Sequence, residues 1–319
     1  MHVTKPPSEA KVLLKGVLFM DEAKRESAGL LYGFFGVLAF SFTLPMTRIA
    51  VETMNPTFVG LGRAVIAGIL AGIVLMIKRE RFPTKAQLKS LAIVAIGVVI
   101  GFPLLTSWAM NQLPANHGAV VIALLPLATA GVAVFRVGER PSLGYWLASI
   151  AGSLIVLCFT FLNGINGLHW ADLALIGAVL LAAVGYAEGG KLSAEMGSWQ
   201  VISWALVLIM PFLLIPVAFA FSDELLQVPL AGWLSFGYVS VISQFVGFLW
   251  WYRGMELGGV ARVSQIQYVQ PFLSIIWAGL LLGETITMTT VVLALGIVLT
   301  VAKGRKTSVR RRVTQEKSA

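Results

Sequence analysis

Ten apolar stretches follow one another along the chain, each about 17 to 25 residues long. An α-helix rises about 1.5 Å per residue, so each stretch can cross about 30 Å of hydrocarbon. Helices are favoured because backbone amides facing lipid must pair within their own segment, whereas barrel strands would show a weaker, alternating pattern. The predicted helices are Ala28 to Ala50, Thr57 to Ile77, Leu88 to Met110, Asn116 to Phe135, Leu143 to Leu162, Trp170 to Lys191, Trp199 to Phe221, Pro229 to Trp251, Val260 to Leu282 and Thr285 to Lys303.

One segment of this pattern occurs twice. Leu113 to Ser142 and Gly258 to Thr287 align without a gap at an offset of 145 positions. The alignment pairs Pro126 with Pro271, Ala133 with Ala278, Gly138 with Gly283 and Glu139 with Glu284. Five helices is an odd number, so two tandem halves of five enter the membrane in opposite directions. The predicted fold is an all-α integral membrane protein of two inverted five-helix repeats around a central cavity, an arrangement that recurs in secondary transporters.

The same pattern divides the chain into four parts. Residues 1–27 contain five basic residues around a short apolar run, Val12 to Met20, and no small-residue cleavage site. We therefore expect a cytoplasmic tail, which could include an interfacial turn of helix, and not a signal peptide. The first repeat is expected at 28–165 and the second at 166–303. A basic cytoplasmic tail is expected at 304–319.

The distribution of Lys and Arg predicts the orientation of the helices. If the amino terminus is cytoplasmic, the tails and the loops after helices 2, 4, 6 and 8 hold 22 of the 24 basic residues. Arg48 and Arg63 remain on the outer side. Arg48 lies four residues before Glu52, so the two side chains can pair on one helix face. Both termini are therefore expected in the cytoplasm of a bacterial inner-membrane protein.

The amino-acid composition is typical of an integral membrane protein. It is 57% hydrophobic and 12% charged, with a mean hydropathy of +0.84, whereas about a quarter of a soluble protein is charged. Of the 24 Lys and Arg residues, 7 lie between Lys303 and Lys317, which favours anionic lipid headgroups over nucleic acid as the partner of that tail. The single cysteine, Cys158, excludes a disulfide framework.

The helices and repeated motifs of the chain resemble those of a known family. Ten helices, two repeats, and a proline followed twelve residues later by Gly-Glu in each half are similar to the drug/metabolite transporter superfamily, specifically its EamA-type members. Within it the chain resembles bacterial exporters of aromatic amino acids. The resemblance implies a basket of helices in which helices 1, 3, 4, 6, 8 and 9 lie nearest the substrate, and it implies export.

Two prolines are candidate hinges. Pro126 and Pro271 lack an amide proton and clash with the carbonyl four residues back. Each predicts a mid-membrane kink with a freed carbonyl, tolerable only where protein or water replaces the lost partner. A static bend for packing is the alternative.

Helices 8 and 9 carry the candidate polar site. Ser264, Gln267 and Tyr268 are expected to face the bundle because unpaired polar groups in hydrocarbon cost several kcal/mol; helix-to-helix hydrogen bonding is the alternative. In helix 8 a polar-to-aromatic stripe is predicted, which could hold an aromatic substrate against Trp251. The stripe consists of Ser240, Gln244, Gly247 and Trp251. Trp250 and Tyr252 form either part of the site or an interfacial belt.

The remaining candidates are ionisable or aromatic residues near the helix ends. His117 and Arg262 occupy equivalent positions in the two repeats and could each bind a carboxylate, or sit solvated at the interface. Glu188, near Tyr186, either binds a substrate ammonium or a proton, or pairs with Lys191. Trp108 either lines a cavity or belongs to an aromatic belt at the membrane interface, and the sequence favours neither alternative.

Glu139 and Glu284 are expected to be structural residues. Each follows a glycine at a helix end, and we expect its carboxylate to accept amide hydrogen bonds from the start of the next helix.

The sequence therefore predicts an inner-membrane transporter that exports amino acids, aromatic ones by resemblance, or related metabolites by alternating access. No phosphate loop, HExxH or nucleophile elbow is present, so neither enzymatic activity nor a cofactor is expected. We expect a monomer or weak oligomer with a small-molecule substrate. An intramembrane lipid-modifying enzyme is the alternative, as is a transporter of another metabolite class; a channel or scaffold would need a continuous polar pore.

Overall fold

Long helices account for nearly all of the regular structure. The computed structural model describes residues 8–136 and 170–289, with isolated positions in 137–169 and 290–299, and side chains from residue 24. Within these residues, eight helical stretches are long and apolar enough to cross a membrane. They are Lys24–Val51, Pro56–Lys78, Lys85–Met110, Ala115–Arg136, Trp170–Met196, Ser198–Phe219, Leu230–Gly258 and Val260–Leu282.

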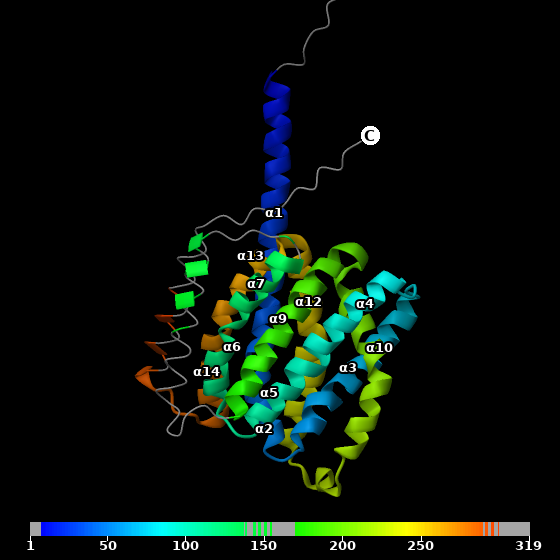
Figure 1. Cartoon of the computed structure of the whole chain (residues 1–319), viewed down its shortest axis with the longest axis vertical. Coiled ribbons are helices and arrows are strands. Elements are labelled where there is room, and N and C mark those ends of the chain that lie inside the picture. The colour runs from blue at the N-terminus through cyan, green and yellow to red at the C-terminus, as the bar shows by residue number, and fades with distance from the viewer. Residues whose placement is uncertain are drawn as a thin grey trace, which may run out of the picture.

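These stretches confirm eight of the ten expected spans to within a few residues. Most of the fifth expected span, Leu143 to Leu162, and about half of the tenth, Thr285 to Lys303, lie outside the described residues, as does the whole 304–319 tail. At the amino terminus, α1 (Ser8–Ser41) is already helical from Ser8, within the expected tail, and extends beyond the bundle (Figure 1).

Capping residues mark where several spans begin and end. The Asn55 side chain accepts hydrogen bonds from the amides of Thr57 and Phe58 at the start of α3 (Pro56–Lys78), at 2.8 and 3.3 Å. Thr84 and Gln87 form a capping box at the start of α4 (Lys85–Val94). Such caps satisfy amides that have no partner within the first turn. The turns of the chain are thus encoded locally.

Several spans are interrupted, and the interruptions recur in both halves. The third span consists of α4, a π-helix, η1 (Ala95–Gly101), and α5 (Phe102–Met110). The eighth span has the same order, with α11 (Leu230–Gly237), the π-helix η3 (Tyr238–Val246) and α12 (Gly247–Gly258). A π-helix widens the helical turn and is frequent at functional sites. The sequence did not predict these two matched segments.

The fourth and ninth spans are broken next to the repeated prolines. Two residues separate the end of α6 (Ala115–Ile122) from the start of α7 (Leu125–Arg136). α13 (Val260–Ser264) is followed by a 3-10 segment, η4 (Gln265–Val269), and α14 (Gln270–Leu282). Pro126 and Pro271 each occupy the second position of the helix after the break, which confirms the predicted interruptions at matched depth.

These broken spans also show that the repeat is inverted. α6 packs against α14 and α7 against α13, and within each pair the two helices are antiparallel (Figure 1). Gly138 and Gly283, which the sequence alignment pairs, both have left-handed backbone conformations, with φ of 74° and 64°. Such angles favour glycine because it has no Cβ.

The bundle has two chemically different ends. At the basic end, α3 ends, α4 begins, α7 and α12 end and α13 begins; at the far end, α3 and α6 begin and α5 and α14 end (Figure 1). Lys78, Lys85, Arg253 and Arg262 lie near the basic end. Arg63, which the sequence places on the outer side, lies inside α3 and is only 1% exposed.

The interior of the bundle lies between the two halves and is surrounded by closely packed helices. α9 (Trp170–Met196) packs against helices of both halves, among them α5, α7, α12 and α10 (Ser198–Phe219). α2 (Thr43–Val51) continues the first span at the far end, and the short η2 (Asp223–Gln227) precedes α11. α1 crosses α12 so closely that a Cβ on Gly29 would lie 2.6 Å from the Gly258 backbone nitrogen.

Candidate functional site

Four aromatic rings meet in the interior of the bundle. Tyr186 of α9 lies 5.3 Å from Trp251 of α12 and stacks on Phe40 of α1 at 6.4 Å, measured between ring centroids. Phe248 contacts Phe40 at 5.0 Å. All four residues are buried. Because the rings come from both halves of the chain, they occupy the region where the halves meet.

A buried arginine lies close to one of these rings, that of Tyr186. Arg63 is the eighth residue of α3, about 10 Å along the helix from its start. Its Nη2 donates a hydrogen bond of 3.0 Å to the Ser243 hydroxyl, which shares a second hydrogen bond of 2.7 Å with Thr43. The Nε and Nη1 nitrogens of Arg63 have no hydrogen-bond acceptor among the residues that the structure describes. Arg63 therefore joins the two halves while keeping free donors.

The π-helix η3 supplies both Ser243, which contacts Arg63, and Gln244. Gln244 donates from Nε2 to the backbone carbonyl of Val98 at 3.1 Å, and its Oε1 has no hydrogen-bond partner in the described ranges. Val98 belongs to the other π-helix, η1. The matched π segments thus contact each other through Gln244.

The 3-10 break in the ninth span contributes a second amide. Gln267 is buried, and neither its Oε1 nor its Nε2 makes a hydrogen bond within the described part of the chain. Tyr186 lies close to Arg63 and to the Gln267 side chain. The Trp251 Nε1 also lacks a hydrogen-bond acceptor among these described residues. Buried polar atoms normally have partners, so several unpaired ones together point to a site that receives them from outside the chain.

We call this group the interior cluster. Its members are Phe40, Arg63, Tyr186, Ser243, Gln244, Phe248, Trp251 and Gln267.

Four of the residues singled out from the sequence belong to the interior cluster: Tyr186, Gln244, Trp251 and Gln267. The helix 8 stripe is confirmed as a buried face, since Ser240, Gln244 and Trp251 are buried. Ser264 is buried beside it but donates its hydroxyl to the Ala261 carbonyl of its own helix, at 3.0 Å. Tyr268 is also buried, one position beyond Gln267.

The two aromatic neighbours of Trp251 differ from each other. Trp250 is partly exposed and contacts Phe35, which fits the interfacial alternative. Tyr252 is fully buried and donates its hydroxyl to the Gly185 carbonyl at 3.1 Å, so an interfacial position is wrong for it.

Glu188 lies toward the basic end, away from the interior cluster. It accepts a hydrogen bond of 2.6 Å from Ser90 and lies 3.7 Å from the Arg136 guanidinium. The expected pair with Lys191 is therefore replaced by one with Arg136 of α7. Glu188 joins three helices and is already paired.

Three other candidates lie near the ends of the bundle. His117 of α6 lies 2.7 Å from the Asp172 carboxylate of α9. Trp108 is 44% exposed and donates from Nε1 to the Thr57 hydroxyl at 3.0 Å. At the basic end, Arg262 is paired with Glu26 of α1. None of the three belongs to the interior cluster.

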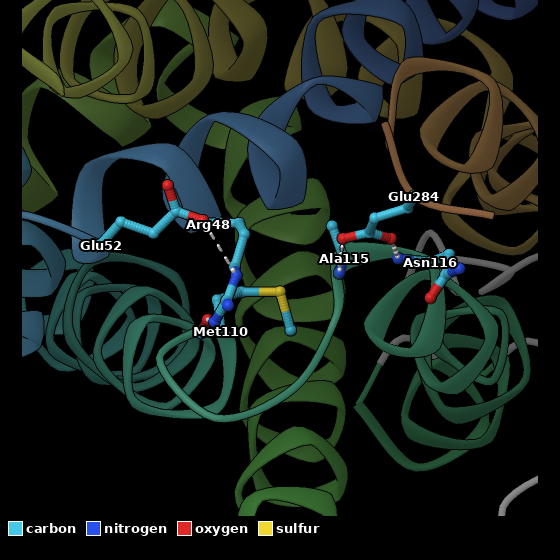
Figure 2. A network of polar contacts seen from close by, with 6 residues as sticks. All are labelled: Arg48, Glu52, Met110, Ala115, Asn116 and Glu284. Atoms are coloured by element: carbon cyan, nitrogen blue, oxygen red, sulfur yellow. Dashed lines mark hydrogen bonds and ion pairs between the residues drawn. The ribbon is translucent and has the colours of Figure 1, made fainter. Parts of the chain in front are cut away.

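Glu284 makes a contact that differs from the expected one. Its carboxylate accepts hydrogen bonds from the Ala115 and Asn116 amides, at 2.7 and 2.8 Å (Figure 2). The capped helix is thus α6 of the other half, and not the helix that follows Glu284. The reason is the inverted packing, which brings the end of α14 beside the start of α6. Glu139 lies outside the described residues.

The same end of the bundle holds a second polar contact. Arg48 donates to the Met110 carbonyl at 2.5 Å and lies 3.6 Å from Glu52 (Figure 2). The predicted Arg48–Glu52 pair is confirmed, and the same guanidinium ties α2 to the end of α5.

Sequence reasoning missed Arg63, Ser243, Phe40 and Phe248, and it overlooked Asp172 as a buried acid. A signal for Arg63 was present, because it is the one charged residue inside the predicted span Thr57 to Ile77, and intramembrane charges usually serve function. No comparable signal marks Phe40 or Phe248 among the many apolar residues. Among the described residues, no cluster of His, Cys, Asp and Glu could hold a metal ion.

Comparisons with known proteins agree on one family. Residues 27–161 and 169–302 each match the EamA-like transporter family. The chain is 44% identical over 279 residues to the uncharacterized transporter YdeK of Bacillus subtilis, covering 87% of this chain and 97% of YdeK.

More distant relatives share most of the chain. A probable terminal-alkyne amino-acid exporter of Streptantibioticus cattleyicolor is 24% identical, over 86% of this chain and 93% of its own. The uncharacterized inner membrane transporter YedA of Escherichia coli is 23% identical, over 79% of this chain and 82% of YedA. A solved crystal structure superposes with a TM-score of 0.63 at 18% identity, covering 87% of this chain and 96% of the other, which shows a shared fold.

Proposed function

Because the chain belongs to the EamA-like transporter family, we propose that it exports amino acids or related small metabolites across the bacterial inner membrane by alternating access. Family membership sets aside the alternative of an intramembrane enzyme. The observation that carries the proposal is the interior cluster, in which unpaired polar atoms lie beside four aromatic rings between the two halves.

The chemistry of the interior cluster suits an amphipathic molecule. Leaving a buried donor or acceptor unpaired costs about 1–3 kcal/mol, so a ligand that supplies partners for Gln267 and Trp251 is favoured. An aromatic side chain can add about 0.5–1.5 kcal/mol through edge or stacked contacts with Phe40 and Tyr186. The relative named as an amino-acid exporter supports the same substrate class.

Contacts at the two ends support alternating access. The Glu284–α6 contact and the His117–Asp172 pair close the far end. The Arg262–Glu26 pair and the α1–α12 crossing close the basic end. In the proposed cycle, the contacts at one end of the bundle break while those at the other end remain formed.

The broken spans are the proposed hinges. Pro126 and Pro271 follow the breaks at matched depth, where the missing amide hydrogen bond reduces the cost of bending. Gln267 lies in the break itself, so a change of angle at Pro271 would move a residue of the interior cluster.

The first prediction concerns transport by the purified full-length protein in liposomes. We expect uptake of labelled tryptophan or phenylalanine above protein-free liposomes, and a weaker signal for threonine, whose side chain cannot use the aromatic rings. The assay is run with and without a proton gradient. Absence of flux for all three amino acids would contradict the proposal, and flux of threonine alone would remove the aromatic preference.

Variants in the same assay locate the site. Gln267→Leu and Trp251→Ala should each reduce flux several-fold while the protein still elutes as a monodisperse species. Trp250→Ala is the matched control, because its indole is partly exposed against Phe35 outside the interior cluster. Equal flux for the Trp250 and Trp251 variants would remove the interior cluster from consideration.

A further inference from the structure

Arg63 differs from every other buried charge that the structure describes. Asp172 is paired with His117, and Glu188 is paired with Arg136. Arg63 is only 1% exposed, yet no carboxylate lies within ion-pair distance of it in the described part of the chain. An isolated buried cation is costly, so a chain that keeps one gains something other than stability from it.

The free donors of Arg63 are arranged to bind an anion. A guanidinium binds a carboxylate with two parallel N–H bonds from neighbouring nitrogens. Ser243 takes a hydrogen bond from Nη2, which carries two N–H groups and is flanked by the free Nε on one side and the free Nη1 on the other. Whichever N–H of Nη2 Ser243 accepts, one complete edge of the guanidinium remains available.

The surroundings of Arg63 are neutral. The other members of the interior cluster are aromatic residues, amides and a hydroxyl, and none carries a negative charge. The nearest buried acid in sequence to Tyr186 is Glu188, whose carboxylate already contacts Ser90 and Arg136. The interior cluster thus offers a cation for an anionic group and no anion for an ammonium group.

Resting on the proposed transport function, we propose that Arg63 binds the carboxylate of the transported molecule while the rings of Tyr186 and Trp251 hold its apolar part. The substrate class is then aromatic and other apolar organic carboxylates. The amino group of an amino acid is tolerated but is not what the site recognises. Ser243 is a positioning residue, because it contacts the guanidinium and Thr43.

The test uses competition against labelled phenylalanine uptake by the full-length protein in liposomes. Unlabelled 3-phenyllactate and 3-phenylpropionate keep the carboxylate without an ammonium and should compete about as well as phenylalanine. Phenylalanine amide and phenethylamine lack the carboxylate and should compete at least about tenfold more weakly. Equal competition by phenylalanine amide would overturn the assignment of Arg63 while leaving the proposed transport function intact.

Variants separate binding from a structural role. Arg63→Met should abolish the increase in thermal midpoint that 3-phenylpropionate gives the detergent-solubilised wild type, without lowering the midpoint of the ligand-free protein. Arg63→Lys keeps the positive charge but loses the planar guanidinium that binds a carboxylate with two N–H groups. It should weaken 3-phenylpropionate binding by about tenfold or less. Arg253→Gln is the arginine control, since Arg253 is exposed and paired with Glu256.

The outcomes distinguish the two proposals. If no solute is transported but 3-phenylpropionate still stabilises the wild type and not Arg63→Met, the carboxylate site stands and the transport function fails. If the ligand-free Arg63→Met protein unfolds at a lower temperature and still binds 3-phenylpropionate, Arg63 is a structural brace and the inference is overturned.

Discussion

At the scale of single residues, Glu284 connects parts of the chain 169 positions apart through one carboxylate. It accepts two amides at the start of α6, where the helix has no internal acceptors for its first N–H groups and where its dipole favours negative charge. The contact lies between the two halves at the far end (Figure 2). It therefore stabilises α6 and also holds the halves together.

Replacing Glu284 by glutamine tests this contact. Glu284→Gln keeps one acceptor oxygen, places an NH₂ group toward the other amide and removes the charge. We expect about 1 kcal/mol of lost stability, seen as a lower thermal midpoint in detergent.

Glu52→Gln is the matched control for that measurement. Glu52 is half-exposed and paired only with Arg48 among the described residues, so its loss should cost less than about 0.5 kcal/mol. Equal midpoints for the Glu284 and Glu52 variants would show that the cap between the halves contributes nothing.

At the scale of elements, the crossing of α1 and α12 depends on glycine. A Cβ on Gly254 would lie 2.8 Å from the Gly29 carbonyl oxygen and from the Gly33 nitrogen. Both neighbours are backbone atoms, which cannot move aside without shifting the helix. Small residues at such crossings allow backbones to approach closely in membranes.

We expect Gly254→Ala to destabilise the protein by about 1–3 kcal/mol, because the added methyl overpacks the crossing. The measurement is the thermal midpoint and the monodisperse yield in detergent. Gly237→Ala is the control, since a Cβ there meets no atom within 4 Å, and its midpoint should be unchanged or slightly higher. A Gly254 variant as stable as the Gly237 variant would mean that α1 and α12 separate easily.

At the scale of the whole molecule, the distribution of basic residues sets an expected orientation. Lys and Arg favour the cytoplasmic side of short loops, and the described basic residues other than Arg48 and Arg63 lie toward the basic end. The loop between α3 and α4 should therefore be cytoplasmic, and η2 should face outward.

Thiol labelling in intact cells checks this orientation. In a Cys158→Ser background, Gln227→Cys should react with an impermeant maleimide from outside, and Ala86→Cys should react only after permeabilisation. Both positions are exposed, so accessibility depends on the side of the membrane. Labelling of Ala86→Cys in intact cells, with Gln227→Cys protected, would reverse the orientation; labelling of both from outside would contradict the bundle itself.

Much of the architecture was encoded locally. Runs of apolar residues predict spans because the bilayer requires about 20 such residues, and the repeated Pro126 and Pro271 predict breaks because proline lacks an amide proton. The inverted repeat followed from counting helices. These features depend on residues near one another in the chain, so the pattern alone was enough to find them.

The partners of individual side chains depended on packing between distant segments. Gln267 and Trp251 were recognised from helical spacing, but Arg63 was read only as an exception to the charge rule, and its contact with Ser243 joins residues 180 positions apart. Glu284 was expected to cap its own neighbour and instead caps a helix of the other half. Spacing along a helix specifies which residues share a face; the tertiary structure alone decided which face of which distant helix each one meets.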